Sequence, residues 1–378
     1  MAGENTFVIN GNELAFEPGE TILDVARRND IDIPTLCHLK SAMPTGICRM
    51  CVVEVEGATQ LLASCATPAA AGMVVQTESS AVVEARKMII RLMLSSGNHN
   101  CAVRGHAGDD WTSFQLQVMQ ADGADELCPV WGDCRLQDLA YRYQVSSEPE
   151  LETPVPYPME TVNPFIVRDF SRCILCGRCV QACNDVQVNE AIEFGYRSAA
   201  TKIVTGPEDR PLKNSDCVFC GECVQVCPVG ALVLKNVRYE ARPWETEKVR
   251  TTCTYCGVGC QMWLHVKENR IEQVTGVEES APNHGSLCVK GRFGYDFVGD
   301  ENRLTAPLIK EGGTFREATW EEALDLVAKK LGQVKNDHGG DAIGMLTSAR
   351  ITNEENYVAN KFARAVLKTN NIDHCARL

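Results

Sequence analysis

Cysteine is the residue that points most directly to chemistry in this chain, with 20 copies in 378 residues. Thiolates are nucleophiles and strong ligands for soft metals, so their spacing decides which chemistry is open to them. The densest region repeats the pattern C-x2-C-x2-C-x3-C. Its two copies are Cys173, Cys176, Cys179 and Cys183, followed by Cys217, Cys220, Cys223 and Cys227. This repetition indicates two related sets of metal ligands.

The repeated pattern predicts two [4Fe-4S] clusters. Three thiolates on one tight loop can reach three irons of one cluster, while the fourth begins a helix that directs it to the other cluster. We therefore expect an exchange of fourth ligands, as in two-cluster ferredoxins. One cluster takes Cys173, Cys176, Cys179 and Cys227, and the other takes Cys217, Cys220, Cys223 and Cys183. Disulfides and structural zinc are the alternatives, which two copies of one four-cysteine pattern disfavour.

The composition fits a metal-binding protein in a reducing compartment. No charged and apolar leader opens the chain, and no apolar run approaches the ~18 residues of a membrane span. We expect a cytoplasmic protein with no membrane span, where thiols stay reduced and many cysteines indicate metal rather than disulfides. The formal net charge of −13 argues against a nucleic-acid partner, because such a partner requires basic patches.

Residues 1–80 predict a small [2Fe-2S] domain. Alternating residues flank Asn10-Gly11, a strong hairpin signal, and Thr21 is placed to cap a short helix that reaches Asn29. Four cysteines follow, with the middle pair two residues apart. They are Cys37, Cys48, Cys51 and Cys65. This order fits a plant-type [2Fe-2S] site in a β-grasp sheet, although the first gap is longer than in the usual pattern; zinc is the alternative.

The first 80 residues resemble the N-terminal domain of multi-subunit hydrogenases, formate dehydrogenases and respiratory complex I. Residues 81–145 resemble the next domain of the same families, which holds a [4Fe-4S] cluster with one histidine and three cysteines. The resemblance implies these ligands here: His99, Cys101, Cys128 and Cys134. His106 is the alternative nitrogen ligand, because it lies in an unusually long interval between the first two cysteines.

An amphipathic helix is expected at the start of this second domain, over residues 81–95. Its expected apolar face includes Val82, Val83, Met88, Ile89, Leu92 and Met93. Residues 146–164 are rich in proline and predict an extended linker. The two-cluster ferredoxin domain is expected over 165–245, with strands at 191–195 and 201–205 between its two motifs.

A different [4Fe-4S] signature lies in residues 246–303. Its cysteines are Cys253, Cys256, Cys260 and Cys288. Strands over 261–266 and 270–274 are expected to bring the last cysteine back to the others. With Val-Lys-Gly-Arg-Phe directly after Cys288, the segment resembles the opening domain of molybdenum or tungsten bis-pterin oxidoreductases, especially formate dehydrogenases. The resemblance implies that Lys290 lies between cluster and pterin; a solvated surface cation is the alternative.

Residues 304–378 resemble the beginning of the catalytic region of these enzymes. We expect a helix from Thr319, a buried strand over 342–346 and a second helix over 353–367. In the formate dehydrogenases that the chain resembles, Cys-Ala-Arg-Leu is followed by the metal-ligating selenocysteine or cysteine. We therefore expect a selenocysteine codon after Leu378. Cys375 is a candidate substitute ligand, although an ordinary thiol is the simpler interpretation.

The number of ligands supports this set of sites. One [2Fe-2S] and four [4Fe-4S] clusters need 20 ligands, four for each cluster. Without Cys375 the chain has 19 cysteines, and His99 completes the number. No catalytic residue for formate chemistry is expected in this chain, so the chain alone should not oxidise formate.

These patterns together predict an α+β multidomain protein. Its parts are a β-grasp [2Fe-2S] domain, a helical [4Fe-4S] domain, a two-[4Fe-4S] ferredoxin domain, a small β [4Fe-4S] domain, and a truncated α/β start of the bis-pterin domain. The resemblance implies the alpha subunit of an NAD-linked formate dehydrogenase, with Mo or W bis-molybdopterin guanine dinucleotide in the full-length subunit. Expected partners are a flavin- and NAD-binding diaphorase-type iron-sulfur subunit, ferredoxin or hydrogenase subunits.

Three other functions stay open at this point. An iron-only hydrogenase shares the layout through the two-cluster domain but does not continue with the signature that ends at Cys288. The iron-sulfur subunit of a complex I-like NADH dehydrogenase shares the first two domains and a related C-terminal region. A free-standing multi-cluster electron carrier would bind iron and no catalytic metal.

Overall fold

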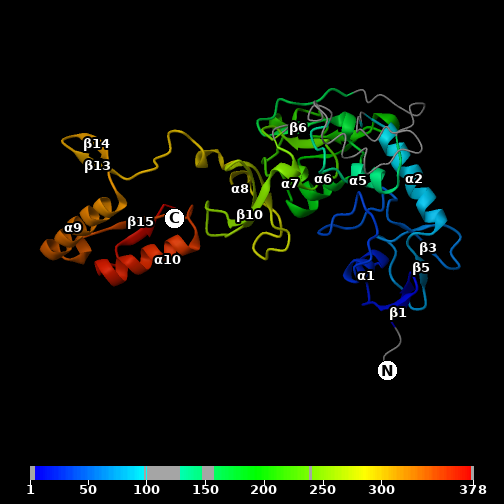
Figure 1. The fold of residues 1–378 in the computed structure, drawn as a ribbon, viewed down its shortest axis with the longest axis horizontal. Coiled ribbons are helices and arrows are strands. Elements are labelled where there is room, and N and C mark those ends of the chain that lie inside the picture. The colour runs from blue at the N-terminus through cyan, green and yellow to red at the C-terminus, as the bar shows by residue number, and fades with distance from the viewer. Residues whose placement is uncertain (1–4, 98, 100–127, 147–156, 238–240, 376–378) are drawn as a thin grey trace. The chain divides into compact units, whose positions relative to one another are not determined.

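The computed structural model describes residues 5–97, 99, 128–146, 157–237 and 241–375. These residues form two compact units, Met1–Thr246 and Glu247–Leu378, which are described separately (Figure 1). Secondary structure is mixed in both units, with short strands and helices connected by long loops. Within the described residues no helix is both long enough and apolar enough to cross a lipid bilayer.

The N-terminal part is a five-stranded mixed sheet packed on one helix. Its strands are β1 (Thr6–Ile9), β2 (Asn12–Ala15), β3 (Val52–Val55), β4 (Leu62–Ala63) and β5 (Val74–Gln76), in the order β2-β1-β5-β3-β4. β1 and β5 are parallel, while the other pairs are antiparallel. The hairpin predicted at Asn10-Gly11 is confirmed; both residues have positive φ, which Gly11 adopts without strain.

Helix α1 (Ile22–Arg28) covers this sheet. Thr21 caps it as predicted, because its side chain accepts from the backbone of Asp24 while the Asp24 carboxylate accepts from the Thr21 backbone. The buried face of the helix joins the sheet in one core. That core contains Phe7, Ile9, Ile22, Leu23, Val25, Ala26, Ile33, Val53 and Val75, together with Cys51 and Cys65. The two cysteines therefore belong to the hydrophobic centre of this part.

The next part is built on helices α2 (Ser80–Ser95) and α5 (Arg135–Arg142). Helix α2 occurs where predicted, but its predicted buried face was partly wrong, since Met88 and Leu92 are about half exposed. The helix instead buries Val82, Arg86, Ile90 and Leu94, four residues spaced at i, i+4, i+8 and i+12. Ile90 and Leu94 share a core with Cys37, Cys48 and Cys134, so cysteine-bearing segments from both parts lie around α2.

The two copies of the repeated cysteine pattern lie around two short helices, α6 (Arg178–Gln181) and α7 (Glu222–Gln225). Two antiparallel ribbons accompany them: β6 (Ile166–Arg168) with β9 (Leu232–Leu234), and β7 (Glu193–Gly195) with β8 (Lys202–Val204). The second ribbon confirms the two strands predicted between the motifs. A 3-10 turn η2 (Phe170–Arg172) and a π turn η3 (Ala182–Val186) flank the first motif. Short turns also occur at Ser198–Ala200, Leu212–Asn214 and Pro243–Glu245.

The second unit begins with a three-stranded antiparallel sheet. Its strands are β10 (Glu247–Thr252), β11 (Gln261–Lys267) and β12 (Arg270–Gly276); the last two confirm the strands predicted after Cys260. Helix α8 (Val289–Phe293) follows Cys288, and the residues on both sides of it, Leu287 and Tyr295, pack with Val274 of β12. A 3-10 turn, Asp296–Val298, leads away from this sheet.

The end of the chain forms an open α/β arrangement. Its elements are β13 (Leu308–Glu311), β14 (Thr314–Glu317), α9 (Trp320–His338), β15 (Met345–Thr347), α10 (Asn353–Phe362) and β16 (Ile372–His374), with turns at Gly340–Ala342 and Ala363–Leu367. β15 and β16 are parallel. The predicted strand over 342–346 is therefore displaced, since its first residues form a turn. Neither α9 nor α10 has a buried residue.

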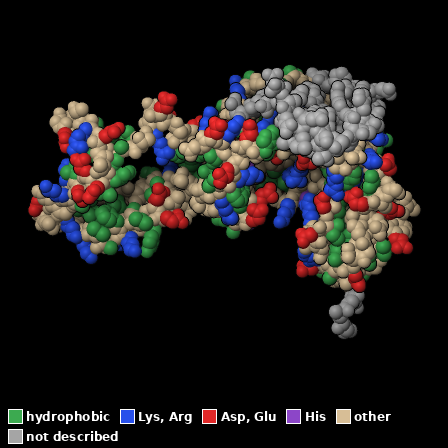
Figure 2. All heavy atoms as spheres, viewed as in Figure 1, with side chains coloured by type: hydrophobic (Ala, Val, Ile, Leu, Met, Phe, Trp, Pro, Cys, Tyr) green, Lys and Arg blue, Asp and Glu red, His purple; other side chains and the backbone are tan. Residues whose placement is uncertain are grey.

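Apolar side chains remain exposed on these helices, and Figure 2 shows hydrophobic surface over this part. Trp320 is 69% exposed, and Leu324 and Val358 are exposed to a similar degree. A two-stranded sheet is too small to bury the apolar faces of two amphipathic helices. For this reason the predicted apolar face of α9 is not buried within the described residues.

Candidate metal centres

The first group of cysteines lies on loops around strand β3. Cys37, Cys48, Cys51 and Cys65 are all buried. A hydrogen bond with Cys48 lowers the pKa of the Cys37 thiol to about 5. In the same way, a hydrogen bond with Cys65 lowers the pKa of Cys51 to about 6. The charge of Cys37 also raises the pKa of both Cys51 and Cys65, so the structure brings all four sulfurs into one site.

The loop from Gly46 to Cys51, which carries Cys48, has the backbone shape of a ligand loop. Gly46 and Arg49 have positive φ, and the Met50 amide donates to Cys48 Sγ at 3.5 Å. Amides directed at sulfur stabilise thiolates and tune an attached metal group. This geometry fits a [2Fe-2S] group better than a disulfide, since the cysteines are free and the loop offers donors to sulfur.

His99 and Cys128 mark a second site, beside helix α5. His99 is 6% exposed, and its Nε2 has no hydrogen-bond partner among the described residues. Burial, followed by the positive charge of Arg172, lowers the pKa of His99 to about 4, against an opposing effect of Asp169. The imidazole is therefore neutral, the form that binds metals. A buried nitrogen without a partner costs ~1–3 kcal/mol, which a metal bond removes.

The cysteines of this second site lie on both sides of a short turn. Cys128 and Cys134 are buried, and Cys134 is the N-cap of α5. Cys101, the other expected ligand, and His106, the alternative, lie outside the described residues. Arg172 Nη1 lies 3.6 Å from Cys128 Sγ, and the Arg242 guanidinium donates to the Cys128 carbonyl at 2.7 Å. Two buried cations therefore approach this one cysteine.

The repeated motifs enclose a cavity of about 40 Å³. Its cysteines are Cys173, Cys176, Cys179, Cys223 and Cys227, and apolar side chains such as Phe170, Ile174, Ile203 and Leu212 complete the lining. Burial raises the pKa of Cys173 to about 11 and that of Cys176 to about 12. Thiols with such high values exist as thiolates at neutral pH only when a metal stabilises them.

Electrostatic neighbours show how the two motifs interlock. The charge of Cys227 raises the pKa of Cys173, Cys176 and Cys179. The charge of Cys183 raises the pKa of Cys217 and Cys223. Cys173, Cys176 and Cys179 therefore lie near Cys227, while Cys217 and Cys223 lie near Cys183; Cys223 also lies near Cys227 of its own motif. Because ligands of one cluster must lie around one point, this geometry fits the exchange of fourth ligands.

One feature of these motifs is not evident from the sequence. Leu175 and Phe219, at the same position in the two copies, have φ of 53° and 54°. Each precedes a cysteine and then a glycine that also has positive φ, Gly177 or Gly221. Non-glycine residues rarely adopt this conformation. Both loops therefore hold a residue in a backbone conformation that its side chain disfavours. The repeat indicates that the two loops share one backbone shape, but Leu and Phe are not residue types that indicate a positive φ.

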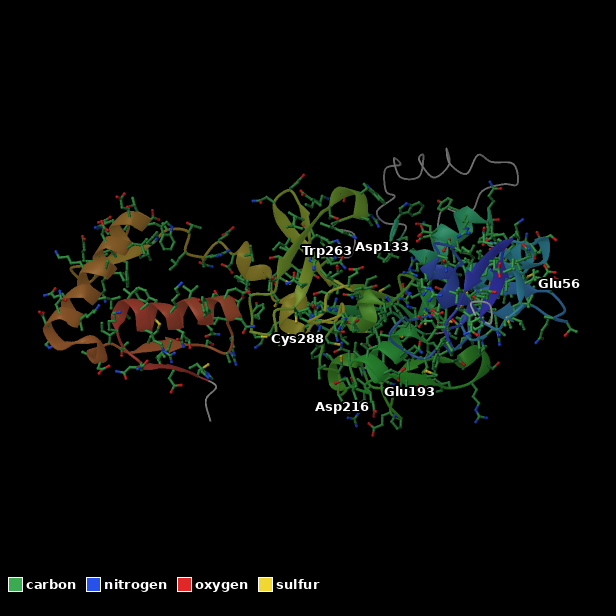
Figure 3. The ribbon with its side chains drawn as sticks, turned by 90° about the horizontal axis from the view of Figure 1, so that it is seen from below. Glu56, Asp133, Glu193, Asp216, Trp263 and Cys288 are labelled. Atoms are coloured by element: carbon green, nitrogen blue, oxygen red, sulfur yellow. The ribbon has the colours of Figure 1, made fainter. Side chains whose placement is uncertain are left out.

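The second unit carries the last group of cysteines, on either side of β11. The charges of Cys256 and Cys288 raise the pKa of both Cys253 and Cys260. The Cys253 amide donates to the Cys260 carbonyl at 2.8 Å. Cys253 is buried and Cys288 exposed; Figure 3 marks Cys288 and the strand residue Trp263. Lys290, next on α8, is exposed.

No three His, Cys, Asp or Glu side chains among the described residues are close enough to hold a single metal ion. A zinc ion requires four donors about 2.0–2.3 Å from one point. In a [4Fe-4S] cluster each thiolate binds a different iron, and in a [2Fe-2S] cluster two thiolates bind each of the two irons, so the four cysteine sulfurs surround a core of several atoms. The grouping seen here is compatible with clusters.

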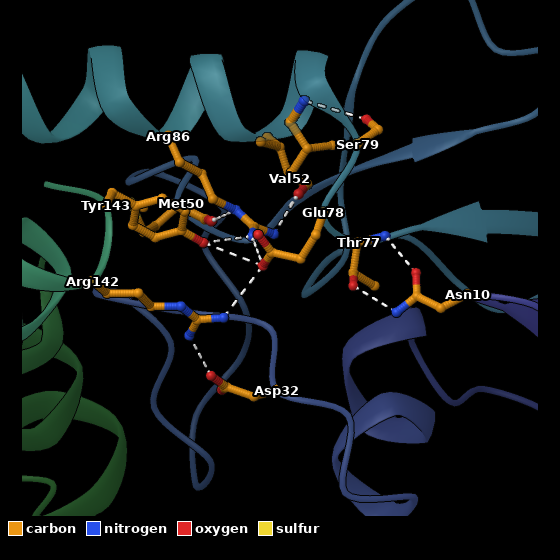
Figure 4. Close-up of polar contacts among 11 residues, drawn as sticks. Asn10, Asp32, Met50, Val52, Thr77, Glu78, Ser79, Arg86, Arg142 and Tyr143 are labelled. Atoms are coloured by element: carbon orange, nitrogen blue, oxygen red, sulfur yellow. Dashed lines mark hydrogen bonds and ion pairs between the residues drawn. The ribbon is translucent and has the colours of Figure 1, made fainter.

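Buried arginines are the other residues that sequence reasoning missed. Arg86 of α2 is fully buried, and it donates to the carbonyls of Met50 at 3.1 Å and Val52 at 2.9 Å (Figure 4). It thereby holds the loop and strand on both sides of Cys51. An arginine inside an amphipathic helix is normally expected at the surface, so only the tertiary structure identifies this role.

Comparison with known protein families matches four segments of the chain. The model of a 2Fe-2S iron-sulfur cluster binding domain matches residues 4–80, and that of a 4Fe-4S dicluster domain matches 172–231. The molybdopterin oxidoreductase Fe4S4 domain matches 246–300, and the molybdopterin oxidoreductase domain matches 303–378. The chain therefore carries domains that match those of molybdopterin oxidoreductases, together with domains that match [2Fe-2S] and [4Fe-4S] cluster-binding families.

Curated relatives match nearly the whole chain. The Bacillus subtilis protein named "Putative formate dehydrogenase YrhE" is 33% identical over 98% of this chain and 39% of the relative. The NADPH-Fe(3+) oxidoreductase subunit alpha of Geobacter sulfurreducens is 34% identical over 99% of this chain and 40% of its own length. An NADH-quinone oxidoreductase subunit of Rhizobium meliloti is 35% identical over 98% of this chain and 40% of the relative. The chain thus spans about 40% of the length of these proteins.

A solved structure also resembles this chain. It is a chain of an NAD+-reducing [NiFe]-hydrogenase in the H2-reduced state, with a TM-score of 0.53 and 28% identity. The match covers 63% of this chain and 90% of that chain. Over 63% of its length the chain is therefore similar in fold and sequence to a chain of that hydrogenase.

Proposed function

We propose that this chain is the iron-sulfur electron-transfer portion of a formate dehydrogenase alpha subunit. In this role it relays electrons between a molybdenum or tungsten bis-pterin site for formate and CO2 and a flavin- and NAD-binding partner subunit. The observation that carries the proposal is the combination, in one chain, of the two molybdopterin oxidoreductase domains with four groups of cysteines that form no disulfides within the described residues. Transfer of single electrons is what such clusters supply.

The proposed ligands follow the grouping of side chains. The [2Fe-2S] site uses Cys37, Cys48, Cys51 and Cys65. The adjacent [4Fe-4S] site uses His99, Cys101, Cys128 and Cys134, and the unpartnered Nε2 of His99 supports its part in this set. The two-cluster domain uses Cys173, Cys176, Cys179 and Cys227, and then Cys217, Cys220, Cys223 and Cys183. The second unit uses Cys253, Cys256, Cys260 and Cys288.

The bis-pterin group would be held mainly outside this chain. Only residues 303–378 match the molybdopterin oxidoreductase domain, and their helices leave apolar faces exposed. We propose Lys290 as a contact between the Cys253 site and the pterin, because it is exposed directly after Cys288 at the start of α8. The partner proposal rests on the likeness to a chain of an NAD+-reducing hydrogenase.

The test combines metal analysis with formate-dependent reduction of a dye. The proposal expects about 18 irons for this segment, molybdenum or tungsten in the full-length subunit, and bleaching of the cluster absorbance when formate is added. Reduction by NADH through the partner subunit should bleach the same clusters. Full iron occupancy with no molybdenum, no tungsten and no response to formate would contradict the formate role while keeping the electron-transfer role.

A second candidate is an NAD(P)H-linked subunit that does not act on formate. The 34–35% identity to an NADPH-Fe(3+) oxidoreductase subunit and to an NADH-quinone oxidoreductase subunit favours it. This candidate shares the proposed cluster ligands but not the formate site. Cluster reduction by NADPH or NADH, in a preparation that formate does not reduce, supports this candidate.

A further inference from the structure

A buried arginine connects the His99 site to the two-cluster motif. Arg172 directly precedes the proposed ligand Cys173, yet its Nη1 lies 3.6 Å from Sγ of Cys128, which is 44 residues earlier in the chain. Its side chain is only 6% exposed. A residue next to a ligand of one proposed cluster therefore brings its guanidinium to a ligand of another proposed cluster.

Asp169 fixes the direction of this guanidinium. Its Oδ2 accepts from Arg172 Nε at 3.2 Å, while its Oδ1 accepts from the Ser171 amide at 3.1 Å. The Asp169 amide donates to the Ala231 carbonyl at 2.8 Å, which ties this turn to the segment before β9. Both charges are thus held by the backbone of the two-cluster domain rather than by flexible loops.

Close packing keeps the arginine against Cys128. A Cβ added to Gly230 would lie 2.9 Å from Cγ2 of Val130 and 3.5 Å from Cδ of Arg172. The segment after Cys128 therefore packs directly on the segment after Cys227, and the Arg172 stem lies beside this contact. Little room remains for the guanidinium to turn towards solvent.

We propose that Arg172 is an electrostatic positioning residue that raises the reduction potential of the cluster at His99, Cys128 and Cys134, while Asp169 limits the rise. The inference rests on the proposed cluster ligands. Reduction adds one negative charge to a thiolate-ligated cluster, so a cation that donates to a ligand sulfur favours the reduced form. The effect is strong because arginine keeps its charge when buried and because a dry site screens charge weakly.

Asp169 and Arg172 place opposite charges beside this cluster. Asp169 Oδ2 accepts from Arg172 Nε at 3.2 Å, and Arg172 Nη1 lies 3.6 Å from Sγ of Cys128. An electron added to the cluster should therefore gain stability from the charge of Arg172 and lose stability to the charge of Asp169.

This opposition of sign gives the experiment. In the full chain, purified without oxygen, R172M should lower the one-electron reduction equilibrium constant of this cluster about tenfold, or ~59 mV. D169N should raise it, and R172K should stay near the wild type because the charge remains. Potentials are read by titration with EPR detection, and H99C identifies the signal. Thermal unfolding of the iron-free chain should show that R172M and D169N are both less stable.

The matched control is R168M. Arg168 is as buried as Arg172, but it pairs with Glu160 at 2.8 Å and lies over the Phe170 ring rather than beside Cys128. This variant should lose stability without moving the potential of the His99 cluster. Shifts of R172M and D169N in the same direction, or no shift in either, would overturn the proposal. If R172M does not retain iron, the sign of the D169N shift decides. A chain without clusters would instead contradict the proposed function.

Discussion

Arg86 Nη1 donates to the Tyr143 hydroxyl at 2.8 Å, although the two residues are 57 positions apart. Tyr143 is the C-cap of α5, the helix that begins at Cys134. The same Nη1 lies 2.6 Å from Glu78 Oε1, while the rest of the guanidinium binds the backbone around Cys51 (Figure 4). One side chain therefore connects the [2Fe-2S] loop to the helix of the neighbouring site.

Replacing Arg86 should destabilise both sites together. R86M leaves the buried carbonyls of Met50 and Val52 without their donors, and each lost partner costs ~1–3 kcal/mol. We expect a total loss of about 3 kcal/mol in the free energy of unfolding of the first unit. Y143F removes one of these bonds and should cost about 1 kcal/mol. Denaturant unfolding of the iron-free chain measures both.

K87M on the same helix is the control for R86M. Lys87 forms a surface pair with Glu84 at 3.3 Å, and such pairs contribute less than ~1 kcal/mol. This variant should unfold within about 0.5 kcal/mol of the wild type. Equal stability of R86M and K87M would show that the buried guanidinium does not hold these two parts together.

The exchange of fourth ligands can be tested at Cys183 and Cys227. C227A should remove the cluster of the first motif and leave that of the second, because Cys227 lies with Cys173, Cys176 and Cys179. C183A should do the reverse. Each variant should lose about four irons, and Mössbauer or EPR spectra show which cluster disappears. C375A should lose none. If C227A removes the cluster of its own motif, the exchange is wrong.

The part played by His99 can be compared with that of a second histidine. Burial is the main cause that lowers the pKa of both His99 and His265 to about 4, but His265 Nε2 has a partner, the Thr275 hydroxyl at 2.9 Å. H99A should therefore lose about four irons, whereas H265A should lose none. H99C should keep the cluster at a lower potential, because a thiolate adds negative charge. If H99A keeps its full iron content, His99 is not the nitrogen ligand and another residue must supply it.

Local patterns predicted the local parts of this structure well. The hairpin at Asn10-Gly11, the cap at Thr21 and the strands between the two motifs depend on neighbours in sequence, and all are present. The buried face of α2 was predicted partly wrong. Its apolar residues surround much of the helix, and tertiary packing selected the row that includes Arg86.

The surroundings of the sites could not be predicted in the same way. Cysteine spacing indicates which residues are ligands because ligand spacing is a local property of a loop. The approach of Arg172 or Arg242 to Cys128 depends on contacts across 44 and 114 residues. The sequence does not indicate which arginines are buried, so the effect of such a residue on a site can be identified only from the folded structure.

Two glycines in the second unit should respond to alanine in opposite ways. A Cβ on Gly276, at the end of β12, would lie 1.8 Å from the Gly285 carbonyl oxygen, so backbone must move and G276A should destabilise the unit by ~1–3 kcal/mol or more. Gly332 lies inside α9 with nothing within 4 Å, so G332A should stabilise it by about 0.5–1 kcal/mol through helix propensity. Unfolding of the full chain, monitored by circular dichroism, measures both. Similar effects of the two variants would contradict the close approach of β12 to the segment before Cys288.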